Sequence, residues 1–251
     1  MSRFRRVAVL VVCLSACGGQ GPRASPQEPG AKVWVGRYEE IEEYLRTAEC
    51  VSLQVFPAKQ GARCTLRLGG PVARLVWRSV PPGVHRGFWE SYKSEIAAYE
   101  VDKLLKLDMV PPTVDRQLEG TPGAAQLWVE GIFPLKPEDS PAGSHRAGWE
   151  KQLVQMSMFD NLIGNKDRNT MNVLRDAAWQ LILIDQTRAF GPGTELPHRL
   201  TRIDHGLWHR IDSLTRDQLD STLRAWLDEK QIGAILERRE RMRADMTLLS
   251  K

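Results

Sequence analysis

The sequence predicts an α+β protein of two lobes, a small β-rich lobe with one helix followed by a mostly helical lobe. Short apolar runs separated by glycine and proline fill the first part of the chain, as expected for the strands of a small sheet. One long amphipathic stretch interrupts these runs, and helical periodicity dominates the second half of the chain. We therefore assign residues 33–131 to the first lobe and residues 132–251 to the second, with the cleft between them as the expected ligand site.

The first residues are typical of a bacterial lipoprotein leader. Residues 1–16 combine a basic start with a short apolar run and end on Leu-Ser-Ala, directly before Cys17. The apolar run is too short to span a bilayer, so we predict a signal peptide that is cleaved before Cys17. Acylation of the Cys17 thiol would then anchor the chain to a lipid membrane. The alternative is an ordinary signal peptide in which Cys17 is incidental.

The leader and the residues that follow it indicate a compartment. They also argue against one class of partner. Residues 17–32 are rich in glycine, proline and polar side chains, which indicates a flexible tether. The leader predicts the bacterial cell envelope, and Gly18 in place of aspartate favours the outer membrane. Loss of the three arginines in residues 1–16 lowers the formal net charge from +4 to +1. We therefore expect no nucleic-acid partner.

Two cysteines remain after the leader and the lipidation site. Cys50 and Cys64 would lie in an oxidising compartment, where a disulfide between them is favoured. The loop that it closes would stabilise the folded chain by about 3 kcal/mol in the chain-entropy model. The alternative is a pair of free buried thiols.

The elements of the first lobe follow from periodicity and from chain breakers. A short helix is expected over residues 37–48, since Ile41, Tyr44 and Leu45 share one face. A longer helix over residues 90–107 carries one apolar stripe and is stopped by Pro111-Pro112. Strands are expected at residues 51–56, 64–68, 72–78, 113–118 and 124–129.

The second lobe begins with a polar loop and continues mostly as helix. Helices are expected at residues 149–163, 215–227 and 229–249, and short strands at residues 173–174 and 181–184. The loop over residues 134–148 contains three prolines. The charged stretch over residues 237–243 is predicted to be a solvated helix face.

The pattern with the most chemistry runs from Phe159 to Phe190. Asp167 is followed by Arg168, and Asn172 comes five residues after Asp167. Asp185 closes the apolar run at residues 181–184. Each of these alone would suit a surface turn. Together they suit phosphoryl transfer, in which one carboxylate orients the attacking hydroxyl while an amide oxygen and a second carboxylate hold Mg²⁺ against phosphates.

Three sequence blocks resemble a known family. KSEIAAYEVDKLLKLDMVPPTV at residues 93–114, MFDNLIGNKDRNTMNV at residues 158–173 and LILIDQTRAFG at residues 181–191 resemble the secretory-pathway Golgi casein kinase family. More broadly, they are similar to the atypical kinase superfamily of phosphoinositide 3/4-kinases and HipA-type kinases. The resemblance covers roughly residues 72–193. It implies a two-lobed protein-kinase-like fold that uses ATP with Mg²⁺ or Mn²⁺ to phosphorylate a protein or small-molecule hydroxyl.

The resemblance also implies roles for individual residues. Asp167 would be the catalytic base, and Asn172 and Asp185 would hold the metal. Glu95 would pair with the phosphate-binding cation or help the metal site. The strand over residues 126–130 would lead into the hinge, where the backbone of Val129 and Glu130 would bind the adenine edge of the nucleotide.

Two departures from the family pattern favour a second hypothesis. Arg78 stands where the phosphate-binding lysine is expected, and its planar fork is not equivalent to an ammonium group. Lys59 or Lys93 would be alternative sources of that ammonium. No clear glycine-rich loop is present, and residues 57–61 are the best candidate for one. The alternative is therefore a catalytically weak or inactive pseudokinase that serves as a binding or scaffold lipoprotein. The sequence leaves the phosphate acceptor unknown.

Overall fold

The computed structural model describes residues 31–56 and 61–249. The predicted leader, Cys17, most of the predicted tether and Lys59 lie outside the described residues. Within the described ranges, no helix has the length and apolar character needed to cross a membrane.

A five-stranded antiparallel sheet forms the first lobe, in the order β1-β2-β3-β7-β6. Its strands are β1 (Cys50–Phe56), β2 (Gly61–Leu66), β3 (Arg74–Arg78), β6 (Thr113–Leu118) and β7 (Thr121–Leu127). The five predicted strands are all present, with shifted ends. Strand β7 starts earlier than predicted because Glu119 and Gly120 both take positive φ angles and close a two-residue turn.

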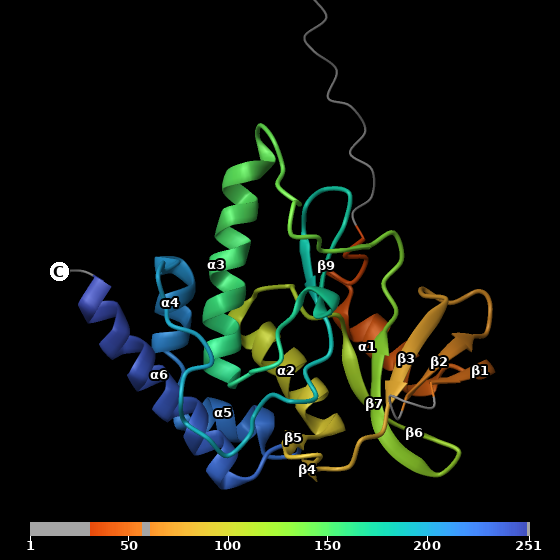
Figure 1. Cartoon of the computed structure of the whole chain (residues 1–251). Coiled ribbons are helices and arrows are strands. Elements are labelled where there is room, and N and C mark those ends of the chain that lie inside the picture. The colour runs from red at the N-terminus through yellow and green to blue at the C-terminus, as the bar shows by residue number, and fades with distance from the viewer. Residues whose placement is uncertain (1–30, 57–60, 250–251) are drawn as a thin grey trace, which may run out of the picture.

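Helix α2 (Tyr92–Leu105) lies between this sheet and the helices of the second lobe (Figure 1). Its Ser91 cap accepts a hydrogen bond from the backbone N–H of Lys93, which places the helix start two residues after the predicted Glu90. Ile96 packs with the sheet residue Ala124, whereas Val101 and Leu105 belong to the core of the second lobe. The helix is therefore buried on both sides.

Asp102 of α2 is a buried carboxyl group with a raised pKa. Its Oδ1 accepts hydrogen bonds from the backbone N–H groups of Met109 (3.1 Å) and Val110 (3.2 Å). Burial raises its pKa to about 7, and the two N–H donors and Lys32 oppose this rise.

We expect Asp102→Asn to change how stability depends on pH. The folded protein binds the Asp102 proton more tightly than the unfolded chain, whose aspartate pKa is about 4. The contribution of Asp102 to the free energy of unfolding is therefore greatest below pH 4 and falls as pH rises toward 7. Asparagine retains the Oδ1 acceptor and cannot ionise. Urea unfolding of both proteins from pH 4 to 8 should thus show that the free energy of unfolding of the variant increases relative to that of the wild type as pH rises. A constant difference between the two would contradict this expectation.

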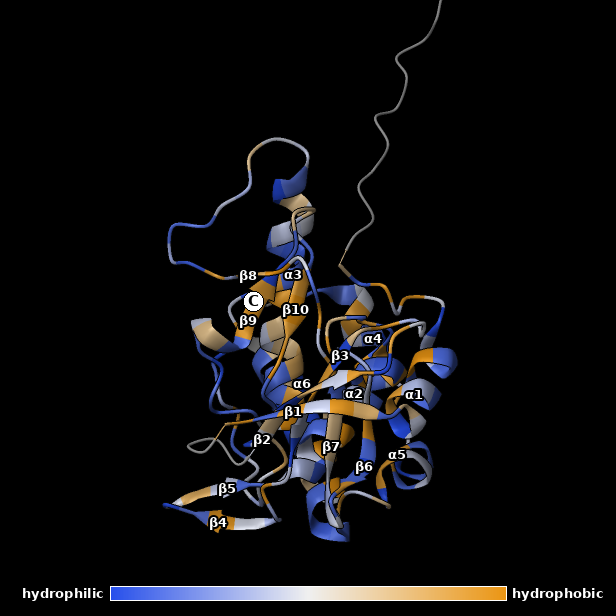
Figure 2. Ribbon diagram, turned by 90° about the vertical axis from the view of Figure 1, so that its right-hand side faces the viewer, coloured by the Kyte–Doolittle hydropathy of each residue, from blue (hydrophilic) through white to orange (hydrophobic). Residues whose placement is uncertain are grey.

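Six α-helices lie within residues 31–56 and 61–249, and four of them, α3 to α6, belong to the second lobe. The second-lobe elements are β8 (Phe133–Pro134), α3 (His145–Ile163), η2 (Thr170–Asn172), β9 (Val173–Arg175), β10 (Leu181–Leu183), α4 (His205–Asp212), α5 (Arg216–Leu223) and α6 (Glu229–Leu249). The first lobe adds α1 (Tyr38–Thr47). Strand β10 is hydrophobic along its length and pairs with β9, which also pairs with β8 (Figure 2).

Several elements of the second lobe differ from the prediction: β8 and η2 were not predicted, and α5 ends at Leu223, before the predicted residue 227. Helix α3 starts at His145, inside the stretch predicted to be a loop. Helix α4 was not predicted, because only eight residues carry its pattern and only Leu207 and Ile211 of them are buried. Its start is nevertheless encoded locally, since the Asp204 side chain accepts a hydrogen bond from the N–H of Leu207.

A hairpin that was not predicted joins β3 to α2. Strands β4 (Gly83–His85) and β5 (Phe88–Glu90) pair across a two-residue turn at Arg86 and Gly87. Both turn residues have positive φ angles, 52° and 86°, as in the turns that suit short hairpins. Glu90, predicted to lie in the helix, belongs instead to β5.

The charged part of α6 is only partly a solvated face. Arg238 is fully buried, and its Nε and Nη1 atoms donate hydrogen bonds to the carbonyl oxygens of Leu162 (2.8 Å) and Gly193 (2.7 Å). Met242, four residues later, is also buried. This arginine satisfies a carbonyl in the last turn of α3, where a cation is favoured by the helix dipole.

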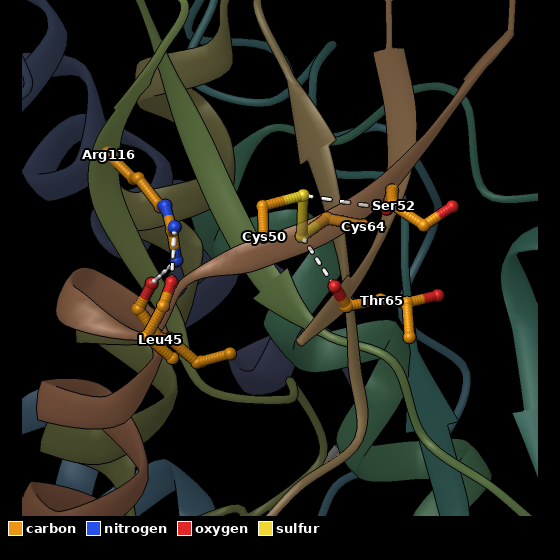
Figure 3. The surroundings of a disulfide bond; sticks show 7 residues. Leu45, Cys50, Ser52, Cys64, Thr65 and Arg116 are labelled. Carbon is orange, nitrogen blue, oxygen red and sulfur yellow. Dashed lines mark hydrogen bonds between the residues drawn. A yellow bond between two sulfur atoms is a disulfide. The ribbon is translucent and has the colours of Figure 1, made fainter. Parts of the chain in front are cut away.

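A disulfide joins β1 and β2 (Figure 3). Cys50 and Cys64 lie on neighbouring antiparallel strands, and their Cα atoms are 5.7 Å apart. In the same region, the Arg116 guanidinium of β6 donates hydrogen bonds to the carbonyl oxygens of Leu45 and Ala48, both at 2.6 Å. These bonds attach the end of α1 to the sheet.

Candidate active site

Asp167 lies in the loop that follows α3. Gly164 ends the helix in the left-handed conformation, with φ 68°, and turns the chain toward the first lobe. The backbone N–H of Asp167 donates a hydrogen bond to the Asn165 side chain at 3.1 Å, which helps to fix the loop. The Asp167 carboxylate is 38% exposed, so it is accessible to a substrate hydroxyl.

Arg168 is the residue that holds this loop together. Its buried guanidinium makes two hydrogen bonds to the Asp160 carboxylate of α3, at 2.9 and 2.8 Å. It also donates to the backbone oxygens of Asn172 (3.1 Å) and Ile184 (3.0 Å) and to the Gln186 side chain (2.7 Å). One side chain thus connects α3, the η2 turn and the segment that carries Asp185. No pattern in the sequence indicated this role for Arg168.

Asn172 and Asp185, the predicted metal ligands, lie on adjoining segments. The backbone oxygen of Asn172 accepts a hydrogen bond from the N–H of Ile184 (3.1 Å), the residue before Asp185. Asp185 has a φ angle of 60°, which is costly for a non-glycine residue and common at functional sites. Its Oδ1 accepts a hydrogen bond from the Thr187 hydroxyl at 2.8 Å.

Arg78 occupies the position at which a phosphate-binding lysine was expected. Its Nε lies 3.2 Å from Glu95 Oε1, and its Nη1 lies 3.5 Å from Asp185 Oδ2. The Glu95 side chain is 1% exposed, and its Oε2 accepts the N–H of Gln186. Burial raises the pKa of Glu95 to about 7, against the lowering effect of Arg78. Arg78 therefore faces the site and does not point outward from the sheet.

Two cavities meet at Arg78. The first, of about 550 Å³, is mainly apolar and opens between the sheet and the second lobe. It is lined by Val55, Phe56, Gly61, Val76, Arg78, Gln126, Leu127, Trp128, Val129, Ile132, Leu174 and Ile184. The second, of about 470 Å³, is polar and is lined by Arg78, Val80, Val84, His85, Arg86, Glu90, Asp167, Asp185, Thr187 and Arg188. This pair of cavities suits a ligand with a flat apolar end and an anionic end.

The other predicted nucleotide-binding residues are divided between site and surface. Val129 lines the apolar cavity. Glu130 is not among the residues that line it, and its carboxylate makes two hydrogen bonds to Arg74, at 2.8 and 2.5 Å. Lys93 lies in the first turn of α2 and lines neither cavity. Among the described residues, the basic side chains that line the polar cavity are three arginines and His85, with no lysine.

The donor chemistry fits a divalent metal that is shared with a nucleotide. Asp185 and Asn172 offer a carboxylate and an amide, the hard oxygen donors that Mg²⁺ takes in proteins. Within residues 31–56 and 61–249, no group of three or more His, Cys, Asp or Glu side chains could hold a metal by itself. Water molecules and phosphate oxygens would complete the coordination, as is common for Mg²⁺.

Arg188 and Glu90 are site residues that the sequence analysis missed. Arg188 Nη1 lies 3.2 Å from Asp167 Oδ1, and its Nε donates to Glu90 Oε1 at 2.9 Å. Arg188 comes three residues after Asp185, and this proximity was the one signal in the sequence that could have identified it. Glu90 had no such signal, because it belongs to the unpredicted hairpin.

The fold and the paired cavities define a two-lobed, kinase-like protein. The structure is similar to that of the Golgi casein kinase with Mn/ADP bound, with a TM-score of 0.60 and 13% sequence identity, covering 83% of this chain and 75% of the other. It is also similar to hydra Fam20 with sugar, with a TM-score of 0.63 and 16% identity, covering 84% of this chain and 88% of the other. These likenesses confirm the predicted fold class.

Sequence comparison leads to the same group of proteins. The chain is 25% identical to the Homo sapiens glycosaminoglycan xylosylkinase over 163 residues, which are 51% of this chain and 40% of that protein. It therefore spans less than half the length of this curated relative. No protein-family model matches the sequence. The predicted resemblance to the Golgi casein kinase group is confirmed.

Proposed function

We propose that this chain is an ATP-dependent phosphotransferase that moves the γ-phosphoryl group to a hydroxyl group of a protein or a small molecule. The observation that carries the proposal is that Asp167 and Asp185 line one polar cavity, directly beside an apolar cavity that suits an adenine ring. The neighbouring structure with bound Mn/ADP supports nucleotide and metal binding in proteins of this fold.

Different residues would bind the adenine, the phosphates and the metal. The adenine would lie against Val76, Val129 and Ile184, and the phosphates would reach the polar cavity at Arg78. Asn172 and Asp185 would hold Mg²⁺ or Mn²⁺, which neutralises phosphate charge when bound. Glu95 and Asp185 orient the Arg78 guanidinium.

Asp167 supplies the base. Its carboxylate accepts the proton of the acceptor hydroxyl as the acceptor oxygen bonds to the γ-phosphorus. The bond from that phosphorus to the bridging oxygen breaks, and its electron pair leaves with ADP. Positioning and electrostatic stabilisation account for most of the rate in such reactions.

A thermal-shift titration of the full chain in detergent tests nucleotide binding. ATP with Mn²⁺ at about 100 times its Kd should add about 2.7 kcal/mol to the free energy of unfolding. For a protein of this size we expect Tm to rise by roughly 5–10 °C. Asp185→Ala should remove most of the shift, whereas Asp115→Asn, an exposed carboxylate on β6, should retain it. Absence of any shift in the wild type would overturn the proposal.

Arg78 favours one second candidate, a pseudokinase that binds partners or nucleotide without transferring phosphate. The guanidinium is already paired with Glu95 and Asp185, which leaves it less available to phosphates than a free ammonium. A nucleotide-dependent thermal shift without any phosphoryl transfer, to acceptor or to water, would support this candidate over the first.

We also propose that the chain is exported and anchored to the outer membrane of a bacterial envelope through acylated Cys17. The leader and the tether support this, and a disulfide is typical of an oxidising compartment. Cells fed labelled palmitate should label the wild-type chain and not Cys17→Ala. Equal labelling of both would contradict the anchor.

A further inference from the structure

Arg188 is held by the start of α2. The backbone oxygen of Thr187, on one side of it, accepts the N–H of Ser91 at 2.9 Å. The backbone oxygen of Ala189, on the other side, accepts the hydroxyl of Ser94, also at 2.9 Å. The same helix carries Glu95, which pairs with Arg78, so α2 places both arginines.

Three groups surround the Arg188 guanidinium. Glu90 accepts from Nε at 2.9 Å, and Asp167 Oδ1 lies 3.2 Å from Nη1. The Phe88 ring lies against the guanidinium, with 4.4 Å between the ring centroid and Cζ. Glu90 and Phe88 both come from the β5 strand of the hairpin. The side chain is 32% exposed, so it is anchored and still accessible to a ligand.

Arg188 also lies at the boundary between two cavities. A third cavity, of about 280 Å³, opens next to the polar one and is lined by Gly87, Phe88, Trp89, Gly164, Lys166, Asp167, Arg188, Gly191, Pro192, Gly193 and Glu195. Asp167 and Arg188 line both this cavity and the polar cavity. These two side chains therefore lie where the two cavities adjoin.

We propose that Arg188 is the cation that contacts the phosphoryl group during transfer, and that the third cavity admits the acceptor hydroxyl. This inference rests on the proposed function. Arg78 is poorly suited to the role, because Glu95 and Asp185 already hold it deep in the cleft. Arg188, with Glu90 retaining its Nε, presents its Nη atoms where the transferred group crosses between the cavities.

Asp167 and Arg188 both take part in the proposed transfer step. The acceptor hydroxyl replaces Arg188 as the partner of Asp167 and gives its proton to that carboxylate. The acceptor oxygen bonds to the γ-phosphorus, and ADP leaves with the electron pair of the broken P–O bond. Arg188, released from Asp167, donates two N–H groups to the phosphoryl oxygens while they carry the most charge.

The test compares binding of a ground state and of a transition-state mimic by the full chain in detergent. Arg188→Gln should leave the Kd for ADP with Mg²⁺ nearly unchanged. It should weaken binding of ADP with Mg²⁺ and aluminium fluoride by about 10²–10³-fold. ATP hydrolysis, with water as the acceptor, should lose a similar factor in kcat with little change in KM for ATP. Arg188→Lys, which keeps the charge and loses the fork, should be intermediate.

Arg224→Gln is the matched control, because the Arg224–Asp220 pair has the same 3.2 Å separation and lies at the C-terminal end of α5. It should change none of these values. If Arg188→Gln lost equal affinity for ADP and for the mimic, or lost affinity for neither, the inference would be overturned. The proposed function would still stand if the wild type hydrolyses ATP. A wild type that binds neither ligand would overturn both.

Discussion

Asp167→Asn is expected to lower the rate of phosphoryl transfer by about 10²–10⁴-fold, the usual contribution of a positioned general base. Asparagine keeps the size of the side chain and cannot accept the proton of the acceptor hydroxyl. The thermal shift with ATP and Mn²⁺ should be retained, because Asp185 and Asn172, and not Asp167, are the proposed metal ligands. The measurement is transfer from radiolabelled ATP to the protein itself or to water.

The Tm of Asp167→Asn distinguishes a loss of phosphoryl transfer from a folding defect. The Asp167–Arg188 pair is about one-third exposed on both sides, so its removal should cost less than about 1 kcal/mol. Tm should therefore stay close to that of the wild type. Asp217→Asn, on the exposed start of α5, serves as the control and should transfer phosphate normally. Undiminished transfer by Asp167→Asn would rule out Asp167 as the base.

Arg168→Met is expected to lower the free energy of unfolding by about 3–5 kcal/mol, because it leaves a buried carboxylate without its partner. Asp160 is 1% exposed, and Arg168 provides two of its hydrogen bonds. For a protein of this size we expect Tm to fall by roughly 6–20 °C. Differential scanning calorimetry of both proteins measures the change.

A double variant identifies the cause of this loss. Asp160→Asn combined with Arg168→Met removes the charge that the single variant leaves unpaired, so the pair should recover part of the lost stability. Arg146→Met, which breaks an exposed pair with Glu150, should cost less than about 1 kcal/mol. If Arg168→Met were as mild as Arg146→Met, Arg168 would not be the residue that holds the catalytic loop.

Much of the fold was predictable because its signals are local. The five strands of the sheet lie between glycine and proline breaks, and α2 and α6 carry clear helical patterns. The hairpin β4–β5 escaped prediction because its strands are three residues each, too short for a period-2 pattern to emerge. The buried Arg238 escaped for a different reason, since its carbonyl partners at Leu162 and Gly193 are distant in sequence.

For the candidate site, the sequence by itself placed Asp167 and Asn172 near each other, because five residues of chain cannot separate them far. Asp185 comes 13 residues after Asn172, and it is the pairing of β9 with β10 that brings it beside that loop. Only the tertiary structure decided that Arg78 faces Glu95 and Asp185, and that Glu90 and Arg188 meet across 98 residues of sequence. Those contacts depend on how α2 packs between the lobes, and no local pattern of residues encodes that packing.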